Sequence, residues 1–283
     1  MTIDSKSGHI RAVGLLIVTA VLWSFGGVLI KLISWNPMAI AGMRSALAGG
    51  VMLVIFRRHY LNWSFVQLAG AICYAANVIL FVIATKLTTA ANAILLQYTA
   101  PVYVALLGAY FLNEKVTRFE WFMILAAIFG IALFFFDRLT LENYWGNMFG
   151  IMAGVSFALF IILMRKQKSE FPIGSIFLGN ILAALIGLPF MFYSMPDRVS
   201  WAALLALGTL QLGLSYILYS IAIRRVAAFE AVMIPIIEPV LNPIWVFLFL
   251  AERPGRWALP GGIIVISAAA VCAWVRVSRP GSN

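Results

Sequence analysis

The chain has 283 residues, of which 63% are hydrophobic and only 11% are charged, and its mean hydropathy is +1.00. Soluble domains average roughly 45–50% apolar and about 25% charged residues, so this composition excludes an ordinary soluble protein and indicates one embedded in lipid. The formal net charge of +10 does not suggest a nucleic-acid partner, because the basic residues lie in short segments between apolar runs, as in cytoplasmic membrane loops.

The apolar runs predict the membrane-spanning helices in chain order. A helix needs about 20 apolar residues to cross the hydrocarbon core. The first run begins near Arg11 and lacks a small-residue cleavage site, so we expect a retained helix rather than a signal peptide. The sequence predicts an all-α membrane protein with ten transmembrane helices, near 11–33, 37–56, 65–85, 89–112, 119–136, 145–164, 173–193, 200–222, 227–250 and 257–275.

The distribution of basic residues predicts the orientation. Loops on alternate sides of the ten helices carry 13 and 6 of the 20 Lys and Arg residues, and Arg44 is left inside the second span. Basic residues are enriched in cytoplasmic loops. We therefore expect a multi-pass protein of a bacterial inner (plasma) membrane with both termini in the cytoplasm.

The chain also repeats itself. Residues 63–133 and 201–271 align without a gap at an offset of 138, with 16 identities that include the pairs Pro101/Pro239 and Glu114/Glu252. The halves, 1–138 and 139–283, then hold five spans each. Because five is odd, the second half must enter the membrane from the opposite side. Inverted repeats of this kind are typical of secondary transporters, whose substrate site lies near the bilayer midplane.

Short motifs resemble those of EamA-type members of the drug/metabolite transporter superfamily over nearly the whole chain. The first span carries Trp23-Ser24-Phe25 through Lys31, and the second carries Arg44. The fourth and ninth spans give matching pieces in the same order: Ala90-Ala91-Asn92-Ala93, Pro101-Val102 and Leu112-Asn113-Glu114-Lys115, then Glu238-Pro239-Val240 and Leu250-Ala251-Glu252-Arg253. The resemblance implies a central cavity lined by spans 1–4 and 6–9, peripheral spans 5 and 10, and export of amino acids, with aromatic amino-acid exporters as the most similar type.

No signature of a cofactor, a metal site or ATP hydrolysis is present in the sequence. There is no Walker A loop, and Cys73 and Cys272 lie in apolar runs without a Cys/His cluster. We expect a facilitated or ion-coupled transporter, with protons as a candidate coupling ion. The sequence leaves open whether it is a monomer or a homodimer.

Glu238 is the strongest candidate for a substrate or proton site. It lies ~16 Å into the ninth span, near the midplane of a ~30 Å core. Pro239 follows it, and the prolines at 235, 239 and 243 predict a bent helix with spare carbonyl acceptors for an ammonium group. The alternative is a structural kink in which Arg44 or a hydroxyl satisfies Glu238.

Two further charged residues have several interpretations. Arg44 could pair with Glu238, bind a substrate carboxylate, or extend toward the outer interface. Glu230 lies on the face of Glu238 but also in the first turn of its helix, where the dipole favours an anion. A structural role for Glu230 is at least as well supported as substrate contact.

Polar and aromatic stripes complete the predicted cavity. Gln211, Ser215 and Tyr219 recur at i, i+4 and i+8, and the repeat maps them onto Cys73, Asn77 and Phe81. The alternative for each polar residue is helix–helix hydrogen bonding. The other predicted substrate-binding residues are Trp23, Asn92, Tyr103, Ser156 and Phe160.

Together these features predict a secondary transporter that exports small metabolites, most simply neutral or aromatic amino acids, by alternating access. The alternatives are an uptake carrier and an exporter of another metabolite, such as a drug-like cation or a nucleoside. A membrane-embedded lipid-modifying enzyme is a remote alternative, because it would need a cluster of acid, base or metal ligands near the interface and the sequence has none.

Overall fold

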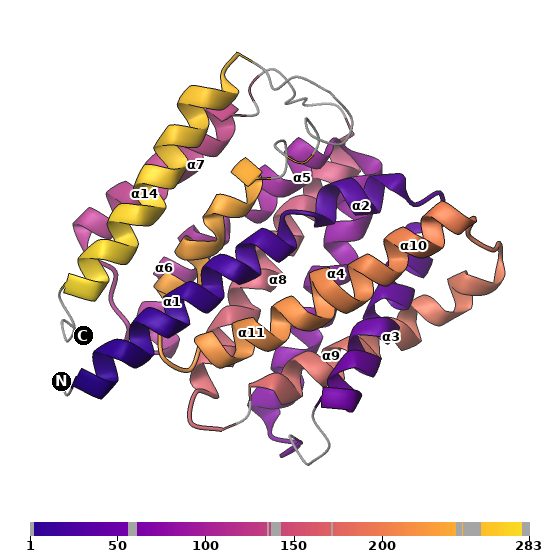
Figure 1. The fold of residues 1–283 in the computed structure, drawn as a ribbon, viewed down its shortest axis with the longest axis horizontal. Helices are drawn as coiled ribbons and strands as arrows, with labels where there is room; N and C mark the ends of the chain where they lie inside the picture. The colour runs from indigo at the N-terminus through magenta and orange to yellow at the C-terminus, as the bar shows by residue number, and fades with distance from the viewer. Residues whose placement is uncertain are drawn as a thin grey trace.

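A computed structural model describes residues 3–55, 61–134, 136, 143–170, 172–241, 245 and 256–278, and this part of the chain is built only of helices (Figure 1). The first half contains α1 (Ile3–Trp23), α2 (Gly26–Leu32), α3 (Pro37–Ile55), α4 (Phe65–Leu87), α5 (Ala90–Gln97), α6 (Ala100–Phe111) and α7 (Arg118–Phe134). The second half contains α8 (Tyr144–Lys166), α9 (Ile173–Gly187) with the 3₁₀ turn η2 (Leu188–Phe192), α10 (Arg198–Ala206), the π-helix η3 (Leu207–Leu214), α11 (Ser215–Ala222), α12 (Ala228–Met233), the 3₁₀ turn η4 (Ile234–Ile237) and α14 (Ala258–Ser278).

Side-chain caps fix where several of these helices begin. The hydroxyl of Ser64 accepts a hydrogen bond from the backbone N–H of Gln67, and the hydroxyl of Thr89 accepts one from Asn92. Each cap satisfies one of the backbone donors that a helix leaves unpaired at its N-terminus. The starts of α4 and α5 are therefore encoded locally.

Eight segments of the described residues are long and apolar enough to cross a membrane. They agree with predicted spans 1–4, 6–8 and 10. The predicted fifth span corresponds to α7, which has 17 residues, and the predicted ninth span continues from η4 into residues outside the described part. The prediction of an all-α membrane protein is confirmed, and the number of ten transmembrane helices stays a prediction.

Four predicted spans are interrupted well before their ends rather than being continuous helices, and the seventh changes from α9 to the 3₁₀ turn η2 only in its last turns. The first breaks at residues 24–25, the fourth breaks between α5 and α6, the eighth contains the π-helical turn η3, and the ninth changes from α12 to the 3₁₀ turn η4. Only the interruption of the ninth was predicted, from its prolines. The π-helix has no proline or comparable sequence signal, and the break after Trp23 falls at the Gly26–Gly27 pair.

The packing of the helices follows the internal repeat. The helix α4 of the first half packs on α8 of the second half, and α11 of the second half packs on α1 of the first half. An offset of 138 residues relates these two contacts. The helices α3 and α9, which are equivalent to each other, pack together, and so do α7 and α14. Such an exchange of partners is expected when a two-fold relation connects the halves. The boundary predicted at residues 138 and 139 lies outside the described residues.

The pair α7 and α14 runs along one edge of the molecule, where α14 also packs against η4 (Figure 1). This agrees with the expectation that spans 5 and 10 lie at the periphery. The marked N- and C-termini lie at the same end of the molecule (Figure 1). An even number of membrane crossings requires this arrangement.

Candidate substrate cavity

A cavity lies at the centre of the helical bundle, between helices of both halves. Its empty space measures about 390 Å³, counting the part that opens outward. The lining residues are Trp23, Arg44, Asn77, Val78, Phe81, Gln97, Tyr98, Phe157, Gln211, Leu212, Tyr216 and Glu238.

The four helix interruptions all meet this cavity. Trp23 ends α1, Tyr98 follows the last residue of α5, Gln211 lies within η3, and Glu238 follows the last residue of η4. Broken helices at the membrane midplane are a recurring feature of transporter substrate sites, since irregular backbone is tolerated there only where it lines a cavity or is buried in protein. The local backbone therefore turns these side chains inward.

Glu238 is only 8% exposed. The hydroxyl of Tyr98 lies 2.5 Å from its Oε2 and 3.0 Å from the carbonyl oxygen of Pro235, so its single proton serves one acceptor at a time. Pro239 has no N–H to bond that carbonyl in a helix, which is why it is free to accept from Tyr98 and from the N–H of Glu238.

Two of the predicted spare acceptors of this helix, the carbonyls of Ala231 and Pro235, already accept hydrogen bonds. The carbonyl of Ala231 accepts a hydrogen bond from the hydroxyl of Tyr219 at 3.2 Å, and the carbonyl of Pro235 lies 3.0 Å from the hydroxyl of Tyr98. Both tyrosines come from other helices, so the sequence of the ninth span alone could not reveal them. A substrate ammonium would have to meet the carboxylate of Glu238 instead.

Arg44 is the other buried charge of the cavity. It is only 2% exposed, and its Nη2 donates a hydrogen bond of 2.8 Å to the carbonyl of Val78. Its Nε is buried without a partner. A side chain that extended to the outer interface would be exposed there, whereas the guanidinium of Arg44 is buried, bonds to Val78 and lines the central cavity. The interpretation that Arg44 extends toward the outer interface is therefore contradicted.

Arg44 and Glu238, both within the described residues, form no ion pair within 4.0 Å, although both line the same cavity. The interpretation that they neutralise each other is therefore wrong for this conformation. The cavity lining therefore contains one basic and one acidic side chain that do not pair with each other.

Amide side chains supply the rest of the polar lining. Nε2 of Gln97 donates a hydrogen bond of 2.8 Å to Oδ1 of Asn77. Gln211 packs against Gly26, where a Cβ atom would approach its Nε2 to 2.8 Å, and its Oε1 is buried without a partner. An unsatisfied buried acceptor costs free energy unless water or a ligand pairs with it.

Ser215, Tyr219 and Phe160 were predicted to line the cavity, but the structure places them behind its wall. Nε1 of Trp23 donates a hydrogen bond of 2.9 Å to Oγ of Ser215. Tyr219 and Phe160 belong to a buried aromatic cluster around Tyr216, and the ring centroids of Trp23, Tyr74, Phe160 and Tyr219 lie 4.8–6.2 Å from that of Tyr216. Phe157 joins the cluster through Trp23, at 5.8 Å.

Three other predicted residues also lie off the cavity lining. Nδ2 of Asn92 donates to Oδ1 of Asn147 at 3.0 Å, joining the start of α5 to α8. Ser156 is half-buried on α8, where the next residue, Phe157, lines the cavity instead. Tyr103 is half-buried on α6, and the break after α5 separates it from the helix face of Asn92.

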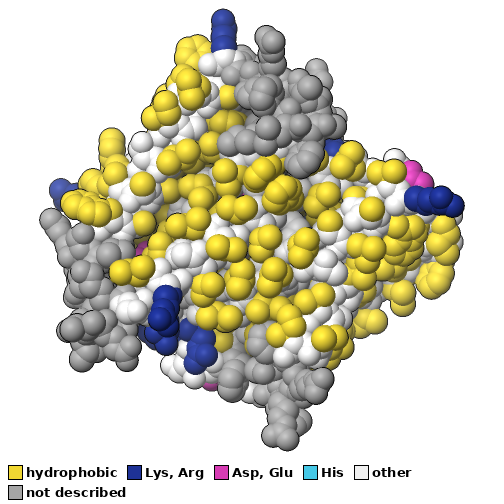
Figure 2. All heavy atoms as spheres, viewed as in Figure 1, with side chains coloured by type: hydrophobic (Ala, Val, Ile, Leu, Met, Phe, Trp, Pro, Cys, Tyr) yellow, Lys and Arg dark blue, Asp and Glu magenta, His cyan; other side chains and the backbone are white. Residues whose placement is uncertain are grey.

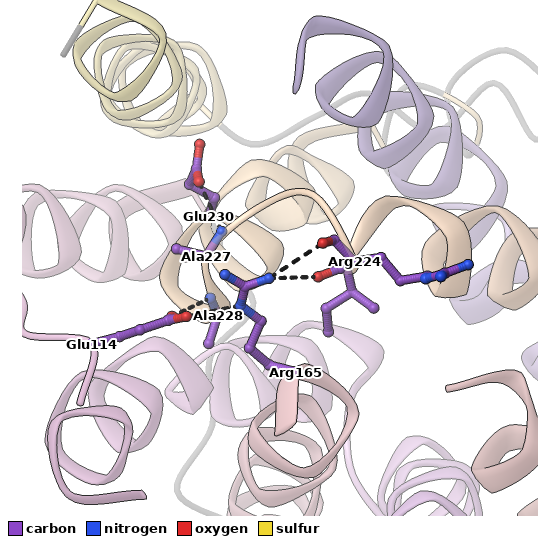
Figure 3. A network of polar contacts seen from close by, with 7 residues as sticks. Glu114, Arg165, Arg224, Ala227, Ala228 and Glu230 are labelled. Atoms are coloured by element: carbon purple, nitrogen blue, oxygen red, sulfur yellow. Dashed lines mark hydrogen bonds and ion pairs between the residues drawn. The ribbon is translucent and has the colours of Figure 1, made fainter. Parts of the chain in front are cut away.

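Glu230 takes part in a polar network at the end of the molecule that holds the N-terminal end of α1. Its Oε1 lies 2.9 Å from Nε2 of His9, and its Oε2 accepts the backbone N–H of Ala227 at 2.9 Å. Figure 3 shows its neighbour Glu114, which pairs with Arg165 at 2.8 Å and caps the N–H of Ala228. Glu230, which was also predicted to bind substrate, lies off the lining of the central cavity, and its carboxylate caps the first turn of α12.

Arg165 extends this network to a third helix end. Its Nη1 lies 3.3 Å and 3.5 Å from the carbonyl oxygens of Ile223 and Arg224, which directly follow α11 (Figure 3). The network therefore ties the α6–α7 connection, α8 and the α11–α12 connection together at this end.

Tyr216 is one of the lining residues that the sequence analysis missed; the others include Val78, Gln97, Tyr98, Phe157 and Leu212. The stripe of Gln211, Ser215 and Tyr219 assumes α-helical spacing, but the π-helix η3 follows i→i+5 hydrogen bonds and rotates the next residues. Gln211 and Tyr216, five residues apart, therefore reach the same cavity. Val78, the repeat equivalent of Tyr216, lines the cavity too, so the internal repeat was the available signal.

The model of the EamA-like transporter family matches residues 10–136 and again residues 144–274. A solved crystal structure shares the fold, with a TM-score of 0.79 and 18% identity, and the match covers 93% of this chain and 96% of the other.

Characterised and uncharacterised transporters are also similar in sequence. An uncharacterized transporter of Archaeoglobus fulgidus is 26% identical over 92% of this chain and 94% of its own length. A probable biotin transporter of Pseudomonas aeruginosa is 30% identical over 79% and 84%. The pseudopaline exporter CntI of the same species is 25% identical over 63% of this chain and 64% of its own length. Members of this family move solutes and are not enzymes. The chain belongs to the EamA-like transporter family of membrane transporters.

Proposed function

We propose that this transporter carries a small zwitterion through the central cavity, most simply a neutral amino acid, aromatic ones included, and that it exports it from the cytoplasm. One observation carries the proposal: Arg44 and Glu238 are buried, face the same cavity and do not pair with each other. A ligand with one carboxylate and one ammonium would match both.

The energetics support a ligand with two opposite charges. A buried charge without a partner is costly, and in membrane helices ionisable residues usually face a cavity or a pathway. A substrate carboxylate could accept from the unpartnered Nε of Arg44, and a substrate ammonium could donate to the carboxylate of Glu238. Without a ligand, Arg44 and Glu238 both remain buried without a partner of opposite charge among the described residues, and both desolvation costs remain. A bound cargo or coupling proton would lower these costs, so alternation between states is favoured only when one of them is bound.

The apolar lining favours substrates with a hydrophobic side chain. Trp23, Phe81, Phe157 and Tyr216 line the cavity opposite a few fixed polar groups. Apolar walls with sparse polar groups are typical of small-molecule sites, and each well-oriented ring pair would add about 0.5–1.5 kcal/mol beyond area burial. Phe, Tyr and Trp meet this description, and Met and Leu fit it less fully.

The alternatives make different demands on the two charges. A drug-like cation would need Glu238 alone, and a monocarboxylate, as expected for a biotin-type cargo, would need Arg44 alone. A nucleoside would need neither charge. Uptake of the same substrates is the runner-up for direction.

The test is a flux assay with purified protein in liposomes. Labelled Phe, Leu, biotin, a lipophilic cation and a nucleoside are compared, with and without an imposed pH gradient, in wild type, Arg44→Gln and Glu238→Gln. We expect flux of Phe and Leu that both substitutions reduce. If the transported cargo depends on only one of the two residues, the substrate class is a cation for Glu238 or a monocarboxylate for Arg44, and the zwitterion is excluded. The direction needs a second test: if the protein exports its substrate, cells that overproduce it should tolerate toxic aromatic analogues better than control cells.

A further inference from the structure

A second hollow lies outside the central cavity, between the first turns of α1 and the end of α11. It measures about 470 Å³, counting the part that opens outward, and is lined by Gly8, Arg11, Ala12, Leu15, Ile221 and Arg225. The first four lie at i, i+3, i+4 and i+7, which is one face of α1. We call it the α1–α11 groove.

The groove carries two positive charges that the described part of the chain does not neutralise. Arg11 and Arg225 are exposed, and neither takes part in an ion pair or a side-chain hydrogen bond with a described residue. Among the residues whose side chains the structure describes, no acidic one lines the groove. Figure 2 shows Lys and Arg side chains gathered at this end of the molecule, beside a broad hydrophobic face.

Gly8 is the residue of α1 against which Arg225 packs. A Cβ atom on Gly8 would lie 2.0 Å from Nη1 of Arg225 and 3.2 Å from its Cζ, so the guanidinium rests directly against the backbone of α1. Arg11 comes from the next turn of the same helix. Because Gly8 has no side chain, the guanidinium of Arg225, from the second half, can lie against α1 near Arg11, from the first half.

The groove lies at the edge of the hydrocarbon layer. The candidate membrane span that contains α1 begins at Ser7, and the one that contains α11 ends at Ala222. Arg11 and Arg225 therefore each lie within about one turn of a span end. Beyond them the surface turns apolar, with Leu15 half-buried and Ile221 48% exposed. A ligand here would meet guanidinium groups at its head and hydrocarbon along its tail.

We propose that the α1–α11 groove binds an anionic phospholipid, with its phosphodiester between Arg11 and Arg225 and an acyl chain along Leu15 and Ile221. Guanidinium groups match phosphate oxygens in geometry and charge. Basic pockets between transmembrane helices are suited to such head groups. Because α1 and α11 belong to different halves, the lipid would bridge the two repeats at one end of the transport pathway.

Native mass spectrometry of the detergent-purified protein tests the proposal. Phosphatidylglycerol and phosphatidylcholine are titrated separately, with glycerol phosphate as the head group without acyl chains. We expect wild type to bind phosphatidylglycerol on the order of tenfold more tightly than phosphatidylcholine, and Arg11→Gln with Arg225→Gln to remove that preference, because each basic residue near a membrane surface contributes measurably to anionic lipid binding. Glycerol phosphate alone should not bind detectably.

Matched variants separate position from charge. Arg118→Gln with Arg198→Gln removes the same total charge from exposed positions outside the groove and should keep the preference. Gly8→Ala keeps every charge but displaces the Arg225 guanidinium, and should weaken phosphatidylglycerol binding several-fold. If wild type binds phosphatidylglycerol and phosphatidylcholine equally well, the proposal is overturned whatever the variants do. It is also overturned if the two double variants lose the preference for phosphatidylglycerol to the same extent. Binding of glycerol phosphate as tight as that of the lipid would make the site one for free phosphate esters instead.

Discussion

At the scale of residues, the two buried charges define the cavity. Arg44 and Glu238 come from opposite halves and enter the same space, yet each is held by a neutral partner: Val78 for the guanidinium and Tyr98 for the carboxylate. The sequence identified both residues, because ionisable groups within apolar spans are rare and costly. It could not decide whether they pair, since that depends on how α3 and the ninth span are placed.

Replacing Glu238 by Gln should reduce flux at least tenfold while leaving expression and folding close to wild type. Gln has nearly the same shape and can still accept from Tyr98, but it lacks the charge that would bind an ammonium or a coupling proton. The measurement is initial-rate flux in proteoliposomes. Glu170→Gln, the same substitution at an exposed loop position, is the control. Wild-type flux in Glu238→Gln at equal reconstitution removes this residue from the substrate site.

A double-mutant cycle tests whether Arg44 and Glu238 interact. Because the structure shows no ion pair between them, the double variant of Arg44→Gln and Glu238→Gln should recover little of the stability that the two single variants lose. Denaturant or thermal unfolding in detergent measures each change. If the double variant instead recovers most of the stability lost in the single variants, a buried pair must form in another populated conformation.

At the scale of elements, close helix packing depends on glycine at a few contacts. Where α3 crosses α9, a Cβ atom on Gly42 would lie 2.8 Å from Cα of Gly187 and 2.7 Å from Cε of Met191. The backbone of the neighbouring helix cannot move away as a flexible side chain could. Gly50, two turns later on α3, has nothing within 4 Å of an added Cβ atom.

Gly42→Ala should therefore destabilise the protein and Gly50→Ala should not. Overpacking typically costs about 1–3 kcal/mol, whereas Ala in place of Gly in an open helical position is worth up to about 1 kcal/mol in soluble helices. Thermal unfolding of the two detergent-purified variants, measured side by side, compares the same chemical change on one helix. An unchanged midpoint in Gly42→Ala would mean that α3 and α9 separate more easily than their contact implies.

At the scale of the whole molecule, the polar network of Glu114, Arg165 and Glu230 ties helices of both halves together at the end that holds both termini (Figure 3). Alternating access requires the two halves to separate at one end while they close at the other. These contacts are the ones that must break if the central cavity is to open toward this end. The distribution of basic residues predicts that this end is cytoplasmic.

The two ends of α8 test that orientation. In a variant with alanine at Cys73 and Cys272, Tyr144→Cys should react with a membrane-impermeant thiol reagent in intact cells, and Ser169→Cys should react only after permeabilisation. Both positions are exposed, and α8 places them at opposite ends. The reverse pattern would place the termini outside, and reaction at both positions in intact cells would show that α8 does not span the membrane.

The sequence by itself determined the membrane class, the helical fold, the duplicated half and the two buried charges, because composition, hydrophobic length and repetition are properties of the chain alone. It also predicted Asn77 and Gln211 from polar stripes, and Trp23 as a separate candidate, and all three line the cavity. Only the tertiary structure decided the rest. The π-helix rotated Tyr216 into the cavity and left Ser215 and Tyr219 behind its wall, and tyrosines from distant helices took the carbonyls that proline had freed. Helix register and contacts between distant segments depend on how the elements pack, and a periodicity read along one span assumes an unbroken α-helix that packing can change.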